Sequence, residues 1–73
     1  MTRTDAFWSA MRELSAALVE CDLLGFDSVS AARSAVLEHD DYAQRWECSA
    51  RVVLAVNRLH FARAIMVGKA VPT

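Results

Sequence analysis

The chain has 73 residues, of which 55% are hydrophobic and 23% are charged, with only two Gly and one Pro. This composition excludes an intrinsically disordered chain, a collagen-like repeat and a Gly/Ser linker, because there is ample apolar surface to bury. We expect a single small domain over residues 1–73, which leaves little room for the deep pocket of an independent enzyme.

Charge is distributed unevenly along the chain, although the formal net charge is only -1. Residues 1–41 hold three basic and eight acidic side chains, a net charge of -5. Residues 42–73 hold five basic and one acidic side chain, a net charge of +4. Opposite charges on the halves are expected to help them pack on each other or on a second copy.

The cysteines and the apolar segments indicate a cytoplasmic protein. Cys21 and Cys48 lie among apolar residues at helical spacing, which is typical of free, partly buried thiols in a reducing compartment. Charged residues interrupt the first apolar positions, so we expect no secretory signal. The most apolar stretch, residues 52–67, is too short and too charged to span a bilayer.

A first helix is predicted over residues 5–24. Thr4 or Asp5 can cap its start, and Gly25 can end it in the left-handed conformation. Apolar residues recur at spacings of three and four, which places them on one helix face: Phe7, Ala10, Met11, Leu14, Ala17, Leu18 and Cys21.

A second, shorter helix is predicted over residues 28–39. Asp27 can cap it, and Val29, Ala32 and Val36 follow at helical spacing. Such a short, Ala-rich helix needs tertiary packing for stability. The following acidic segment, residues 39–41, forms either a sharp turn or a kink.

A third helix is predicted over residues 41–67, because no Gly or Pro occurs between Tyr42 and Gly68. Asp40 or Asp41 can cap its start, and Gln44 fits a capping box. Gly68 and Pro72 supply the stop signal and leave residues 68–73 as a tail. The predicted fold is therefore all-α, with two shorter helices packed on one long C-terminal helix.

The third helix is apolar on two adjacent faces, which is wider than the stripe of a surface helix facing one core. One face holds Tyr42, Ala43, Trp46, Ala50, Val53, Leu54, Phe61 and Ala64. The first two helices can cover only one face, so we expect an antiparallel homodimer to cover the other. The expected dimer interface is Cys48, Val52, Val56, Leu59 and Met66. The alternative is a compact monomer with a kinked third helix.

No residue pattern predicts catalysis, a metal or a cofactor. The potential ligands, which are His39, Asp40, Asp41, Cys48 and His60, lack the paired spacings of a zinc site. Cys48 and His60 lie three turns apart on one predicted helix, so they cannot form a nucleophile and base within one chain. There is also no glycine-rich phosphate loop.

Two groups of residues are candidates for binding a partner. Trp8 and Val19 lie at the edge of the first helix's apolar face, where an exposed tryptophan can anchor an interface. Leu23 extends this apolar set. The second group is an acidic corner at the start of the third helix, made of Asp40, Asp41 and Tyr42, with Arg45 one turn on.

In size, helical content and charge, the chain is similar to the small helical proteins with which phages and bacteria inhibit larger regulators. Anti-activators and anti-repressors of transcription are examples. That similarity implies a non-enzymatic inhibitor of a regulator, but it assigns no functional residues.

Two alternative functions are open from the sequence. One is a small helix-turn-helix-like DNA-binding regulator that uses the basic residues of the third helix, which include Arg51 and Arg58. The acidic turn before that helix and the net charge disfavour nucleic acid. The other is an assembly subunit or toxin-neutralising partner.

Overall fold

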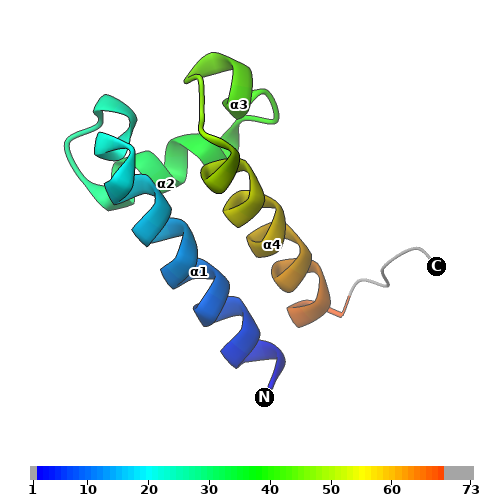
Figure 1. Cartoon of the computed structure of the whole chain (residues 1–73). Helices are drawn as coiled ribbons and strands as arrows, with labels where there is room; N and C mark the ends of the chain where they lie inside the picture. The colour runs from blue at the N-terminus through cyan, green and yellow to red at the C-terminus, as the bar shows by residue number, and fades with distance from the viewer. Residues whose placement is uncertain (1, 69–73) are drawn as a thin grey trace.

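The computed structural model describes residues 2–68 (Figure 1). Over this range the chain is helical and contains no strand, which confirms the all-α prediction. Its elements are α1 (Arg3–Glu20), the 3-10 turn η1 (Asp22–Gly25), α2 (Val29–Glu38), α3 (Tyr42–Arg45) and α4 (Ala50–Met66). Most of the expected tail, residues 69–73, lies outside the described residues.

Helix α1 begins earlier and ends earlier than predicted. Its N-cap is Thr2, which forms a reciprocal capping box with Asp5, so neither Thr4 nor Asp5 is the cap. The helix ends at Glu20 instead of residue 24, because the next turn is left-handed: φ is 54° at Asp22 and 85° at Gly25. Gly25 is therefore left-handed as expected, but it ends η1 and not α1.

Helix α2 matches its predicted range closely. The cap is Ser28, one residue after the expected Asp27, and its hydroxyl oxygen accepts a hydrogen bond from the Ala31 N–H at 3.1 Å. Ala32 and Val36 are buried as their spacing predicts.

The predicted helix over residues 41–67 is wrong in one respect, because the structure breaks it in two. The one-turn helix α3 ends at Arg45, and Glu47 has a φ of 49°. Ser49 then caps α4 by accepting a hydrogen bond from the Val52 N–H at 3.3 Å. The long C-terminal helix is thus 17 residues long, and left-handed Gly68 follows its end as expected.

The break coincides with an aromatic cluster. The Trp46 ring packs edge-on against Phe26 and His39, with centroid distances of 5.7 and 5.4 Å. These contacts join the end of α3 to the segments on either side of α2. A continuous helix through residues 46–49 would place Trp46 in line with α4 and away from Phe26 and His39. The aromatic contacts are therefore a physical reason for the turn.

The helices form an antiparallel pair with a cover at one end. α1 and α4 lie side by side, while η1, α2 and α3 gather at the upper end of both helices (Figure 1). We call this the loop end, and we call the opposite end, with the start of α1 and the end of α4, the terminal end. The largest fully buried side chains are Leu14, Leu18, Val36, Val52, Val56 and Leu59.

Among the described residues, no helix combines the length and the apolar character needed to cross a bilayer.

Candidate protein-binding surfaces

Large apolar side chains remain on the surface of two helices. Among the described residues, those exposed by more than half are Trp8, Val19, Leu54, Phe61 and Val67. Singly exposed apolar residues are common, but Trp8 with Val19 and Leu54 with Phe61 recur on one helix face each. These two faces are the candidate binding surfaces.

The first surface, the α1 outer face, consists of Trp8, Arg12 and Val19. Their spacings of four and seven place them on one side of α1, about three turns from end to end. The Trp8 ring packs edge-on against the half-buried Phe7, with a centroid distance of 5.3 Å. Phe7 thus limits the positions of an indole that is 52% exposed. The prediction from the sequence that Trp8 and Val19 lie exposed is confirmed, whereas Leu23, which was expected to be exposed with them, is half-buried.

The second surface, the α4 outer face, consists of Ala50, Leu54, Phe61 and Ile65. Spacings of four and seven residues align them on the side of α4 away from its buried residues. Leu54 is 52% and Phe61 55% exposed. Sequence reasoning named neither as a site residue, although their seven-residue spacing was the available signal.

The expected dimer interface is corrected by the structure. Val52 and Val56 are fully buried and Leu59 is 2% exposed, all within the single chain. Cys48 and Met66, from the same predicted face, are half-buried. This face packs inside the chain, so the apolar side chains that α4 leaves exposed lie on its opposite side.

The structure removes Tyr42 from the accessible surface of the acidic corner. Tyr42 is buried, and its hydroxyl donates a hydrogen bond to the Val53 carbonyl oxygen at 3.4 Å, so its expected role as a partner contact is wrong. Asp41 and Arg45 pair with each other at 3.2 Å, and this hydrogen bond lowers the pKa of Asp41. Asp40 is exposed. What remains at the corner is a solvated turn with a local ion pair.

The structure does not bring the acidic corner and the α1 outer face together. The corner lies at the start of α3, above the beginning of α4, whereas Trp8 lies near the terminal end of α1 (Figure 1). Val19 is close to the loop end, followed by the half-buried Leu23 of η1. The predicted partner-binding residues therefore belong to two separate surfaces.

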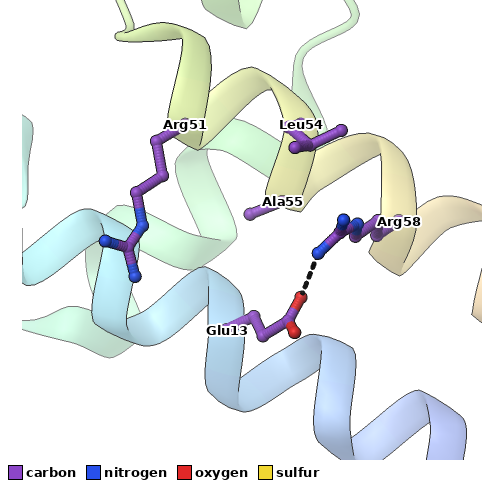
Figure 2. A pocket seen from close by; sticks show the side chains of 5 residues that line it. All are labelled: Glu13, Arg51, Leu54, Ala55 and Arg58. Carbon is purple, nitrogen blue, oxygen red and sulfur yellow. Dashed lines mark hydrogen bonds and ion pairs between the residues drawn. The ribbon is translucent and has the colours of Figure 1, made fainter.

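Two of the basic residues of α4 are neutralised within the chain. Arg51 pairs with Glu20 at 2.7 Å, and Arg58 pairs with Glu13 at 3.1 Å. Figure 2 shows Arg51 and Arg58 on either side of Ala55, with Glu13 bonded to Arg58. The carboxylates beside these two arginines reduce the net positive charge of the face that would meet DNA phosphates.

The reactive side chains do not form a chemical centre. In the described part of the chain, no group of three or more His, Cys, Asp or Glu side chains could hold a metal ion. Burial raises the pKa of the Cys48 thiol, which lowers its nucleophilicity at neutral pH. The Cys21 sulfur lies 3.3 Å from the Ser49 hydroxyl oxygen, and the two groups share a hydrogen bond.

Three hollows on the described surface lack the apolar and aromatic lining that is usual for a ligand pocket. One of about 210 Å³ is lined by Leu54, Ala55 and the side chains of the Arg58–Glu13 pair and Arg51. Two others, of about 330 Å³ each, are lined mainly by polar side chains and alanine. Ligand pockets are usually rich in apolar and aromatic side chains.

Comparisons with protein-family models, curated proteins and solved structures found no match for this chain.

Proposed function

We propose that this chain is a non-enzymatic protein that binds and inhibits or modulates a larger protein. The proposed target is a transcriptional regulator, as for anti-activators and anti-repressors of phages and bacteria. The observation that carries the proposal is the exposed Trp8, held on the α1 outer face by the Phe7 ring.

A tryptophan in this setting is a strong anchor for an interface. Burying an indole removes a large apolar area from water, and tryptophan is enriched among the residues that dominate binding energy. Because Phe7 already restricts the ring, less side-chain entropy is lost on binding. Val19, three turns along the same face, provides a second apolar contact, so α1 suits an apolar groove or helix of the target.

The charge of the loop end favours a basic target. Residues 20–51, which form this end, hold seven acidic and three basic side chains, a net charge of -4. Surfaces that bind DNA are positively charged. Val19 of the α1 outer face lies next to this acidic end. A regulator held through that face would therefore have negative charge beside the Val19 end of the contact, which opposes DNA binding by occupation and by charge. The DNA-binding alternative has less support, because Arg51 and Arg58 are paired with carboxylates.

The test is affinity capture from nuclease-treated lysate of the source cells, followed by measurements with the purified target. We expect one stoichiometric protein with the wild-type chain and its loss with Trp8→Ser and Val19→Ser together. With the purified target, the double variant should bind at least about 30-fold more weakly, as expected for loss of a hot-spot tryptophan. The wild-type chain should also release the target from its DNA.

A matched control replaces two exposed uncharged residues away from the α1 outer face, Ser34→Ala and Gln44→Ser, which should leave capture and affinity unchanged. Equal capture by the wild type and the Trp8/Val19 variant would contradict the proposed surface. Salt-sensitive binding of the purified chain to duplex DNA, lost in Arg51→Ala with Arg58→Ala, would instead support the DNA-binding alternative.

A further inference from the structure

We infer that the α4 outer face binds a second copy of this chain, with the two α4 helices antiparallel about a twofold axis between Asn57 and Arg58. This surface lies on a different helix from the α1 outer face, so the inference does not depend on the proposed function.

The spacing of the exposed apolar residues fits this pairing. The four residues of the α4 outer face follow one another at steps of four, seven and four residues, with the polar Asn57 between Leu54 and Phe61, so they form one line along a helix–helix seam. An axis between Asn57 and Arg58 sets Leu54 of one copy opposite Phe61 of the other. It also sets Ala50 opposite Ile65, so a small side chain meets a large one at each end of the seam.

The surface beside Leu54 can receive the phenyl ring that this register brings to it. The hollow of about 210 Å³ there is lined by Leu54, Ala55, Arg51 and the Arg58–Glu13 ion pair, with Arg51 and Arg58 on either side of Ala55 (Figure 2). An aromatic ring placed there would be buried against Leu54 and the aliphatic stems of the two arginines. Each copy would supply one phenyl ring and one hollow, as a closed twofold dimer requires.

The charge distribution selects the antiparallel orientation. The loop end, residues 20–51, has a net charge of -4, whereas the other described residues hold four basic and two acidic side chains, a net charge of +2. Antiparallel helices set the acidic loop end of each copy beside the basic terminal end of the other. Parallel helices would bring two acidic ends together, which is unfavourable.

The first experiment is sedimentation equilibrium of the purified full chain at about 100 μM. We expect twice the 8.1 kDa mass of the single chain. Leu54→Glu and Phe61→Lys, made separately, should each raise the dimer dissociation constant at least about tenfold, since each places a charge in the apolar seam. Both residues are more than half exposed, so circular dichroism should show unchanged helical content.

The second experiment tests the register. The variant with Leu54→Glu and Phe61→Lys in one chain places a carboxylate opposite an ammonium at both ends of the antiparallel seam. Its dissociation constant should fall back at least about fivefold from that of the single variants. In a parallel dimer like charges would meet at each position, and no such recovery would occur.

The control is the Trp8→Ser, Val19→Ser chain, which should remain dimeric. A wild-type chain that is monomeric at this concentration overturns the inference, as does a dimer that tolerates both single variants. A double variant no more dimeric than the single variants overturns the antiparallel register. If the control chain stays dimeric but the wild-type chain captures no target, the proposed function fails while this inference stands.

Discussion

The backbone of Glu47 has the left-handed conformation at the point where α3 gives way to α4, with a φ of 49°. This conformation brings Cβ too close to the following carbonyl oxygen and costs about 1–2 kcal/mol in residues other than glycine. Asn and Asp tolerate it through local hydrogen bonds, but the longer Glu side chain is not enriched there. The neighbouring aromatic contacts of Trp46 hold the turn in place despite this cost.

Glycine at this position should therefore stabilise the protein. Glu47 is exposed, so Glu47→Gly removes little packing and relieves the left-handed strain, partly offset by greater freedom of the unfolded chain. We expect the free energy of unfolding, measured by urea titration, to rise by about 0.5–1 kcal/mol. Glu47→Ala keeps the strain and serves as the control. An equal gain from alanine would assign the effect to the lost charge.

At the scale of the element, the pairing of α1 with α4 depends on small side chains. Ala17 lies between Glu13 and Glu20 along α1, and Ala55 lies between Arg51 and Arg58 along α4. Because these four charged residues form two ion pairs across the helices, Ala17 and Ala55 face each other between the pairs. Both alanines are buried, at 0% and 5% exposed, so the helices approach closely there.

A larger side chain at this contact should force the helices apart. We expect Ala17→Leu to lower the free energy of unfolding by about 1–3 kcal/mol, the usual cost of overpacking. Ala16→Leu is the matched control, because Ala16 is the exposed neighbour on the same helix and should change stability by less than about 0.5 kcal/mol. Urea titrations that show equal losses for both variants would contradict the close approach.

The elements were predictable to different degrees from the sequence. Spacing of apolar residues identified the helices at α1, α2 and α4, because burial of one face is a local pattern. The break at residues 46–49 was not predictable in this way. It coincides with contacts of Trp46 with Phe26 and His39, which lie outside the helices α3 and α4 and are brought to Trp46 by the fold. Ser49 was the one local signal, as a residue type that favours helix N-caps.

The candidate site was only half predictable for a related reason. Trp8 and Val19 were identified because the first helix has one clear apolar face, and they lie beside it. The C-terminal helix has two apolar faces, and helical spacing alone does not say which one packs inward. Only the partner helix decides, and α1 covers the face of Val52 and Val56, leaving Leu54 and Phe61 outside.

At the scale of the whole molecule, the two proposed binding surfaces lie on different helices, so both can be occupied at the same time. The α1 outer face is proposed for the target and the α4 outer face for a second copy. A dimer built on α4 would present two copies of Trp8 at once, so a target with two matching sites would be held more tightly than a single contact allows.

The antiparallel pairing of α1 and α4 also has a consequence for the speed of folding. The two ion pairs that join these helices link residues 31 and 45 positions apart, so the chain must close a long loop before its largest contact forms. Folding rates fall as contacts become more distant in sequence. The architecture thus makes closure of this long loop part of the slow step of folding.

Reordering the chain would test this directly. A circular permutant that opens within residues 39–41 and joins Gly68 to Thr2 through a flexible linker of about eight residues makes α4 and α1 neighbours in sequence. We expect stopped-flow refolding to become several-fold faster, with little change in the unfolding rate. An unchanged refolding rate would mean that α1 meets α2 and η1 first, and that α4 docks only after the slow step has passed.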